Sequence, residues 1–311
     1  MSEENKLPLV IILGPTAVGK TTVSIGLARR LDGEIVSADS RLLYRGMDIG
    51  TAKPKPDEMT YIPHHLIDVA DPDERWSLAI YQQEAYRIID EIHSRGRLPF
   101  LVGGTGQYIR SIVEGWRIPP QKPDLALREA ITHWAEEIGA EGLYERLKRI
   151  DPTAASKIDY RNLRRTVRAL EVIFLTGERF SDLRRKQTPR YNPLILGIER
   201  SRESLYDRID RRIEQMLDQG LVEEVQGLVD AGYSQDLPTF SAIGYAEIIQ
   251  YLQGDISLEE AVVLIKRNTR IFVRRQANWF KPNDERITWF KASPHLIDDM
   301  EAYIRRNLDG I

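Results

Sequence analysis

The sequence predicts an α/β fold, a parallel sheet flanked by helices, with an inserted all-helical module. From residue 7 to about 118, short apolar runs alternate with amphipathic stretches, which is typical of strand–helix units. The first apolar run leads into a glycine-rich loop. From about residue 124 to 187 the pattern indicates helices alone. We therefore expect a core at 1–118 plus 193–311 and a helical module at 119–192, a size typical of a small domain.

The glycine-rich loop, GPTAVGKT, matches the phosphate-binding pattern G-x-x-x-x-G-K-[ST]. An apolar run at 7–13 precedes it and a helical pattern at 22–31 follows, so the core is expected to be P-loop NTPase-like. Backbone N–H groups of such a loop surround phosphate oxygens at a helix N-terminus. The side chain of Lys20 adds positive charge, and the hydroxyl of Thr21 is expected to bind Mg²⁺. The residues expected to contact linked phosphates are Gly14, Pro15, Thr16, Ala17, Val18, Gly19, Lys20 and Thr21.

Polar residues follow two further predicted strands. The strand at 33–39 ends in Asp39 and Ser40, and the strand at 98–103 ends in a loop, GGTG, that contains Thr105. Ligands of open α/β sheets bind outside the carboxyl ends of the strands. We therefore expect these three side chains to lie at the same edge of the sheet as the phosphate loop.

The remaining elements follow from periodicity, caps and breakers. The predicted strands are 63–69, 193–198 and the ITWF run that precedes a terminal helix, with loop at 41–54. The predicted helices are 76–95, 124–138, 141–149, 153–158, 161–176, 179–186, 201–219, 221–231 and 257–280.

Composition excludes several classes of protein. The 311 residues include no cysteine, which rules out disulfides, a cysteine zinc site and a thiol nucleophile. We find no signal peptide and no apolar run of membrane-spanning length, so a cytoplasmic protein without a membrane partner is expected. The 44 basic and 47 acidic residues give a net charge of −3.

Two segments depart from this acidic average. Residues 161–190 carry nine Arg or Lys and three acids, a net charge of 9 − 3 = +6, and Arg161, Arg164, Arg165 and Arg168 have the spacing of one helix face. In the helix at 257–280, Lys266, Arg270 and Arg274 are four residues apart. Either cluster alone fits a solvated helix face, but together they favour an RNA backbone.

Taken together, several motifs resemble the tRNA dimethylallyltransferase (tRNA isopentenyltransferase) family, in a form without the eukaryotic zinc-finger extension. They are the phosphate loop, the Asp39-Ser40 pair with Tyr44, MDIGTAKP at 47–54, HHLID at 64–68, GGTGQY at 103–108, RALE at 168–171, Gly244-Tyr245 and KRxxRxxxxRQxxWF at 266–280. The resemblance runs from residue 7 to about 281, and MDIGTAKP is its most specific part. Val18, Leu42 and Gln107 depart from the residues common in the family.

The resemblance implies transfer of a dimethylallyl group from dimethylallyl diphosphate to N6 of adenosine 37 in tRNA, with Mg²⁺. The phosphate loop, which alone would be assigned to ATP, then holds the diphosphate of the donor. Asp39 is expected to be the base, with Thr21 and Arg212 (or its rival Arg208) acting on the diphosphate. The inserted module is expected to grip the anticodon stem, and the protein is expected to be a monomer. The expected tRNA-binding residues are Asp39, Ser40, Arg41, Leu42, Thr105, Arg128, Arg164, Arg165, Arg168, Ser241, Gly244, Tyr245, Lys266, Arg270 and Arg274.

Three alternatives use the same loop. An adenylate isopentenyltransferase would act on free AMP or ATP, but the two basic clusters would then have no obvious use. A small-molecule kinase would not explain MDIGTAKP. An RNA-binding module with a vestigial loop would not need an intact Lys20, Thr21 and Asp39.

Overall fold

The structure is a computed structural model that describes residues 6–118, 124–183 and 188–308. It divides into two compact units. One comprises Met1–Ser77, Tyr81–Val113 and Arg190–Ile311, and the other comprises Leu78–Ile80 and Glu114–Pro189. Within the described ranges, no helix combines the length and the apolar character needed to cross a membrane.

The larger unit is built on a six-stranded sheet in which all neighbouring strands are parallel, which confirms the predicted fold class. The strand order β3-β2-β4-β1-β5-β6 brings the carboxyl ends of β1, β2 and β4 side by side. The strand predicted at 63–69 is only two residues long, because Leu66 and Asp68 have φ values of 59° and 54°, in the left-handed region. The strands are β1 (Pro8–Leu13), β2 (Gly33–Ala38), β3 (His64–His65), β4 (Leu98–Gly103), β5 (Asn192–Glu199) and β6 (Ile287–Lys291).

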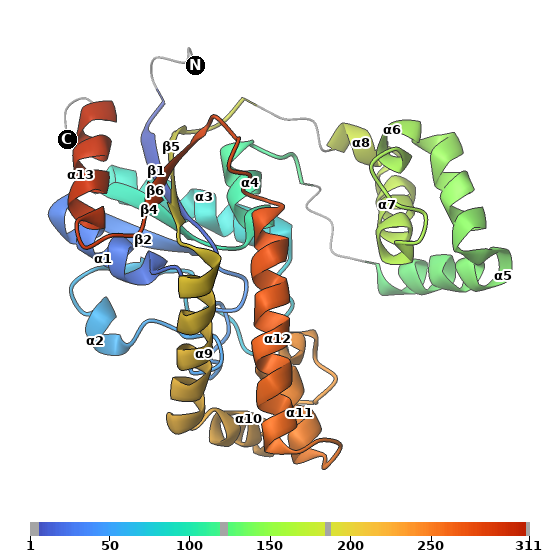
Figure 1. Cartoon of the computed structure of the whole chain (residues 1–311). Coiled ribbons are helices and arrows are strands. Elements are labelled where there is room, and N and C mark those ends of the chain that lie inside the picture. Colours follow the sequence, from blue (N-terminus) through green and yellow to red (C-terminus); the bar gives the residue numbers. More distant parts are fainter. Residues whose placement is uncertain (1–5, 119–123, 184–187, 309–311) are drawn as a thin grey trace. The chain divides into compact units, whose positions relative to one another are not determined.

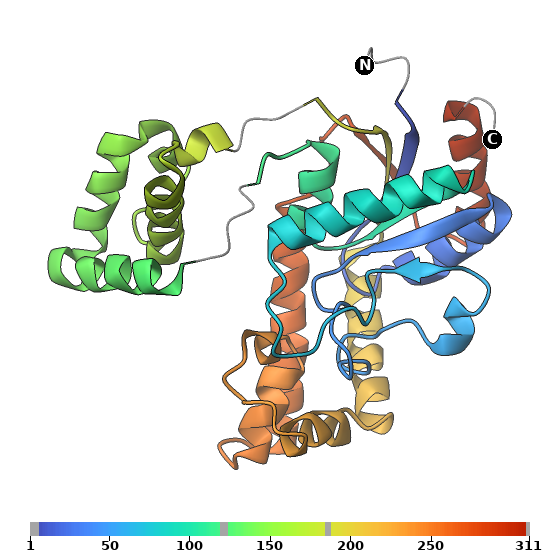
Figure 2. The same ribbon diagram turned by 180° about the vertical axis from the view of Figure 1, so that it is seen from behind.

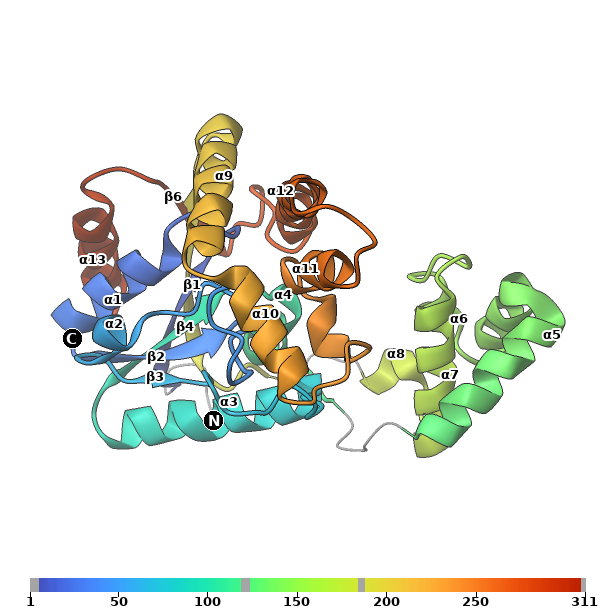
Figure 3. The same cartoon turned by 90° about the horizontal axis from the view of Figure 1, so that it is seen from below.

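Helices cover both faces of this sheet (Figure 3). The helices α1 (Lys20–Arg30) and α13 (Leu296–Asn307) pack together on one face, and α3 (Leu78–Ser94) runs along the other. In α1, a Cβ atom at Gly26 would lie 2.7 Å from the side chain of Ile297, so the two helices approach as closely as glycine allows. Two short helices, α2 (Pro56–Met59) and α4 (Gly106–Val113), were not predicted from the sequence.

A group of helices lies beyond the carboxyl ends of the strands (Figure 1). It consists of α9 (Arg202–Asp218), α10 (Leu221–Asp230), the 3₁₀ turn η2 (Pro238–Ser241), α11 (Tyr245–Leu252) and α12 (Leu258–Ala277). The helix α12 begins as predicted at a capping box, in which Ser257 Oγ accepts from Glu260 N at 3.2 Å. This group places α9 and α12 side by side at the edge of the sheet that carries the phosphate loop.

Among the described residues of the smaller unit, all regular elements are helices, as predicted. They are α5 (Leu125–Ile150), α6 (Pro152–Ala155), α7 (Leu163–Thr176) and α8 (Phe180–Leu183). The bend in α5, visible in Figure 2, lies at Gly139 (φ 76°, ψ 160°), between the two helices expected there. Buried residues such as Leu143, Leu147 and Leu170 form the core of this unit.

Two predicted elements of this unit need correction. The helix expected at 161–176 begins at Leu163, because the side chain of Asn162 caps it by accepting from Arg165 N at 3.2 Å. Arg161 therefore lies outside the helix and does not share its arginine face. The helix expected at 153–158 ends at Ala155. Of the helix expected at 179–186, residues 184–186 lie outside the described residues.

Glycine is required where β4 ends. A Cβ atom at Gly103 would lie 2.2 Å from the carbonyl oxygen of Ala38 in the neighbouring strand. We expect Gly103→Ala to lower the free energy of unfolding by about 1–3 kcal/mol, because the clash involves rigid backbone. Gly227, which lies in α10 with open space around it, provides the control: Gly227→Ala is expected to raise stability by about 0.5–1 kcal/mol. Urea denaturation of both variants measures the difference, and equal effects would contradict the assigned strand contact.

Candidate active site

The phosphate loop connects β1 to α1 and has the backbone that its sequence demands. Ala17 and Gly19 have φ values of 62° and 109°, and a Cβ atom at Gly14 would lie 2.8 Å from the carbonyl oxygen of Ile198. The ammonium group of Lys20 donates to the carbonyl oxygens of Gly14 (3.0 Å) and Pro15 (2.8 Å). Burial lowers the pKa of Lys20 to about 8, although the carboxylate of Asp39 acts in the opposite direction.

Two arginines outside the loop hold two more of its carbonyl oxygens. Arg208 Nε on α9 donates to Ala17 O at 2.8 Å, and Arg200 Nε after β5 donates to Val18 O at 3.1 Å. Arg208, the rival of Arg212 for the diphosphate, thus supports the loop backbone. Arg200 was not identified from the sequence, since no local pattern marks it.

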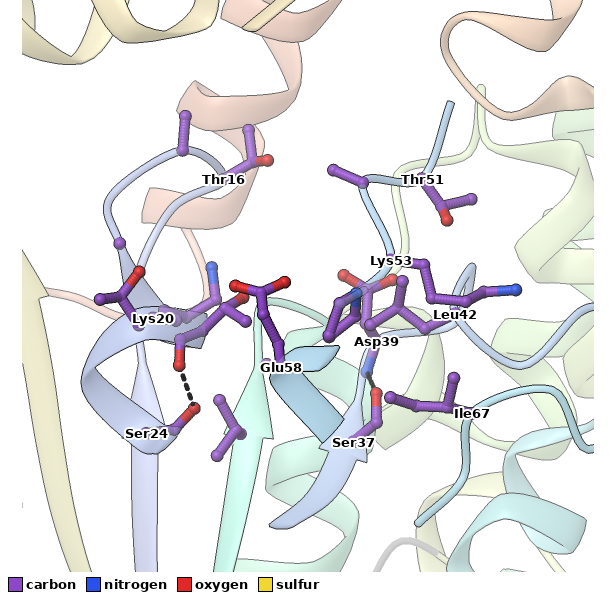
Figure 4. Close-up of a pocket in the computed structure, with 18 of the residues that line it drawn as sticks. Thr16, Lys20, Ser24, Ser37, Asp39, Leu42, Thr51, Lys53, Glu58 and Ile67 are labelled. Atoms are coloured by element: carbon purple, nitrogen blue, oxygen red, sulfur yellow. Dashed lines mark hydrogen bonds between the residues drawn. The ribbon is translucent and has the colours of Figure 1, made fainter. Parts of the chain in front are cut away.

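A cavity of about 510 Å³, which we call the loop cavity, opens in front of the phosphate loop. In Figure 4, Thr16 and Lys20 lie on the side of the phosphate loop and Asp39, Thr51 and Lys53 lie on the other side, where the side chain of Lys53 extends away from the loop. Its further lining includes Thr21, Leu42, Arg208, Arg211 and Arg212. With several cations around it, this cavity suits a multiply charged anion.

A second cavity, of about 370 Å³, adjoins the first, and we call it the helix cavity. Its apolar wall comes from α9, α12 and the segment before α11, and consists of Ile209, Ile213, Met216, Ile243, Ile265 and Phe272. Its polar lining includes Ser40, Arg41, Thr105, Ser241 and Arg275. The two cavities share five lining residues: Thr16, Ala17, Asp39, Thr51 and Arg212.

Asp39 therefore lies where the two cavities meet. Its Oδ1 accepts from Arg41 N at 2.9 Å, and its own N–H donates to Ser37 Oγ at 3.3 Å, which fixes the carboxylate after β2. The nearby guanidinium of Arg212 has its pKa lowered by burial, an effect that the charge of Asp39 opposes. The structure thus brings together Asp39, Thr21 and Arg212, the three residues expected to be catalytic.

Thr105 and Arg41 brace the turn around Asp39. The hydroxyl of Thr105 accepts from Ser40 N at 3.1 Å, and Thr105 N donates to Ala38 O at 3.1 Å. The guanidinium of Arg41 donates to Thr239 O at 3.1 Å and to Ser241 Oγ at 3.3 Å. Arg41, expected to contact tRNA, therefore uses these donors to hold η2, which precedes Gly244.

The MDIGTAKP run is held by a carboxylate from a distant helix. Glu224 on α10 accepts from the backbone N–H groups of Asp48 (3.0 Å), Ile49 (2.7 Å) and Gly50 (3.1 Å). It also accepts from the hydroxyl of Tyr245 at 2.5 Å. Glu224 was not predicted from the sequence, because nothing near it in the chain marks it. The anchored run presents Thr51, Ala52 and Lys53 to the loop cavity.

Three residues expected to bind tRNA differ in their surroundings. The side chain of Tyr245 is fully buried, so it packs against the protein interior and offers no surface to RNA. Gly244, its neighbour in the chain, is also buried but lines the helix cavity. Leu42 lines the loop cavity and not the helix cavity.

The expected RNA-binding arginines of the helical unit fall into two groups. Arg164 and Arg165 are exposed on α7. Arg128 and Arg168 both pair with the fully buried carboxylate of Glu171, with nitrogen–oxygen distances of 2.9 Å. Their charge is thus partly neutralised within the unit.

Along α12, some cationic side chains are paired with carboxylates and others are not assigned such a partner. Lys266 pairs with Glu214 at 2.9 Å and Arg270 with Asp210 at 2.6 Å, both partners lying on α9. The guanidinium of Arg270 also lies over the ring of Tyr206, 5.1 Å from its centroid. Arg274 lines a shallow groove with Arg267 on the same helix.

The loop cavity offers few protein ligands to a divalent cation. The hydroxyl of Thr21 and the carboxylate of Asp39 both line it, and Mg²⁺ in proteins commonly takes one or two such ligands together with substrate phosphates. In the described part of the chain, no cluster of three or more His, Cys, Asp or Glu forms a metal cage. The site therefore suits a metal that arrives with a phosphorylated substrate.

Fold and site together define a P-loop α/β enzyme in which an anion cavity adjoins an apolar one. The IPP transferase family model matches residues 42–283, and the chain belongs to this family. It is 50% identical over 304 residues to a tRNA dimethylallyltransferase of Roseiflexus sp., covering 98% of this chain and 100% of the relative.

Solved structures agree with this assignment. The tRNA isopentenylpyrophosphate transferase of Bacillus halodurans is 44% identical, with a TM-score of 0.72 over 96% of each chain. A eukaryotic dimethylallyltransferase acting on tRNA is 26% identical, with a TM-score of 0.83 over 97% of this chain and 79% of the other.

The lowered pKa of Lys20 predicts how anion binding depends on pH. The protonated ammonium attracts an anion, so the affinity for inorganic diphosphate should fall as pH rises above about 8, by up to about tenfold per pH unit. Calorimetric titration between pH 7 and 9.5 measures this. Lys20→Arg keeps its charge over this range and is the control, since the titration of the ligand itself affects both proteins alike. Parallel affinity profiles for the two proteins would contradict the prediction.

Proposed function

We propose that this chain transfers the dimethylallyl group of dimethylallyl diphosphate to N6 of the adenosine beside the anticodon, position 37, in tRNA. One observation carries the proposal: an anion cavity and an apolar-walled cavity meet at a single carboxylate, Asp39. The names of the relatives, which are tRNA dimethylallyltransferases, support the donor and the acceptor.

The loop cavity receives the diphosphate of the donor. Backbone N–H groups of the phosphate loop, Lys20 and Arg212 bind its oxygens, and they stabilise the charge that develops as the bond between carbon and oxygen breaks. Thr21 would hold Mg²⁺, which would supply further positive charge to the leaving group. The apolar wall at Ile209 and Ile213 keeps water from the dimethylallyl carbon.

The helix cavity receives the adenine, which must leave its stack in the anticodon loop. Asp39 accepts a hydrogen bond from the N6 amino group. As the nitrogen forms its bond to the allylic carbon, the electron pair of the broken carbon–oxygen bond leaves with diphosphate, and Asp39 takes the proton that the nitrogen loses. Thr105 and Arg41 act through the turn that they brace, and keep Asp39 aimed at the junction of the cavities.

The rest of the tRNA is held by positive charge. Arg164 and Arg165 on α7 and Arg274 on α12 are the residues that we assign to phosphate contacts. We also propose a cytoplasmic monomer, since one tRNA supplies an extended asymmetric partner.

A transfer assay tests this function against its alternatives. Incubation with labelled dimethylallyl diphosphate and unmodified tRNA, AMP or ATP is expected to label tRNA alone, and only tRNAs with adenosine at position 37. Label in AMP would favour an adenylate isopentenyltransferase, and phosphate transfer from ATP would favour a kinase; either result would overturn the proposal.

The same assay tests the base. Asp39→Asn is expected to lower the transfer rate about 10²–10⁴-fold, because the amide keeps the hydrogen bond from Arg41 N but cannot take a proton. Asp73→Asn, at an exposed site, should match the wild type. Filter retention of tRNA is expected to be unchanged in both variants. If Asp39→Asn lost tRNA retention along with transfer, Asp39 would be a structural residue.

The exposed arginines of α7 are tested by salt dependence. The double variant Arg164→Ala/Arg165→Ala is expected to weaken tRNA binding and to reduce the slope of log K against log salt by about two. Arg161→Ala is the control, since Arg161 pairs with Asp159 at 2.8 Å before the helix begins. An unchanged slope in the double variant would mean that Arg164 and Arg165 do not contact tRNA and that this face of α7 is simply solvated.

A further inference from the structure

A single buried carboxamide connects the loops that follow two neighbouring strands, β1 and β4. Gln276 lies in the last turn of α12, and its side chain is only 5% exposed. Its Oε1 accepts from Thr16 N at 2.9 Å, and its Nε2 donates to Gly104 O at 3.2 Å. The backbone partners determine this orientation of the amide: the N–H of Thr16 needs an acceptor, which is the side-chain oxygen, and the carbonyl of Gly104 needs a donor, which is the side-chain NH₂ group.

The surrounding packing leaves this carboxamide no freedom. A Cβ atom at Gly104 would lie 2.3 Å from Gln276 Nε2, and one at Gly106 would lie 2.3 Å from the ring of Trp279. The glycines after β4 therefore admit the end of α12. Arg110 of α4 closes the contact by donating to Trp279 O at 2.8 Å.

Each end of this connection leads to the reacting groups. Thr16 belongs to the phosphate loop and lines both cavities. Gly104 precedes Thr105, whose hydroxyl accepts from Ser40 N and so fixes the turn that carries Asp39. Through Gln276, the loop that holds the diphosphate and the turn that holds the base are set at one separation.

We propose that Gln276 is a positioning residue that sets the distance between the phosphate loop and Asp39, an inference that rests on the proposed transfer reaction. Gln276 lines neither cavity, so it acts on the alignment of the two reactants and not by contact with them. A misplacement of about 1 Å between reacting groups can lower a rate about 10²-fold. Since the phosphate loop keeps its contacts with Lys20, Arg200 and Arg208, anion binding should survive the loss of Gln276.

The test compares two substitutions of similar size. Gln276→Met removes both hydrogen bonds, and we expect kcat to fall about 30–100-fold, with the Kd of inorganic diphosphate within about threefold of wild type and cooperative thermal melting retained. Gln276→Glu keeps the acceptor for Thr16 N but sets a carboxylate against Gly104 O. Gln250→Glu, exposed on α11, is the control and should match the wild type.

The glutamate variant gives a second readout that a merely structural residue would not produce. A protonated carboxyl group has one donor and one acceptor, like the carboxamide, and burial favours that neutral form. The ratio of its kcat to that of the wild type at the same pH should therefore rise as pH falls from 8 to 5.5. The cations of the adjoining elements, Lys20, Arg110 and Arg275, are common to both proteins.

Four results would overturn the inference alone, given an active wild type. They are a kcat for Gln276→Met within about threefold of wild type, a diphosphate affinity that falls in parallel with kcat, a ratio for Gln276→Glu that does not change with pH, and loss of cooperative melting in both variants. A wild-type protein that transfers nothing to tRNA would instead overturn the proposed function, and this inference with it.

Discussion

The carbonyl oxygens of the phosphate loop are held by cationic side chains, and the candidate site depends on this arrangement. Lys20 binds two of them, and Arg208 and Arg200 bind one each. Because the N–H and C=O of a planar peptide point in opposite directions, fixing the carbonyls also fixes the N–H groups that an anion needs. Arg200 directly follows β5 and Arg208 lies in α9, so the loop depends on the sheet and on the helices beyond it.

The opposite wall of the site uses the reverse combination, an anion that holds N–H groups. Glu224 binds three successive N–H groups of the MDIGTAKP run, and a buried Tyr245 contributes a fourth donor. A Cβ atom at Gly50 would lie 2.5 Å from the ring of Tyr245, which explains why glycine is needed there. Both walls are thus preorganised before any substrate binds, so little binding energy is lost in ordering them.

Charge clusters in the sequence overstate the number of cations available to RNA. The cluster at 161–190 and the face of α12 were both predicted as RNA contacts, yet Arg168 and Arg270 each have a carboxylate partner within 3 Å. Glu171 lies in the same helix as Arg168, but its burial was invisible in the sequence. Asp210, which binds Arg270, is 60 residues away on α9. A count of charges along one helix could not include a partner from another.

By itself, the sequence determined the parallel sheet, the phosphate loop, the helical insertion and the placement of Asp39 and Thr105 at one edge of the sheet. Each of these follows from a local pattern of apolar residues, glycines and caps, which a short segment expresses without help from the rest of the chain. The tertiary structure alone decided which side chains brace the site. Gln276 meets Thr16 across 260 positions of the sequence, and Arg200, Glu224 and Arg41 act over similarly nonlocal contacts. Such partners are chosen by packing between elements, which no periodicity within one element records.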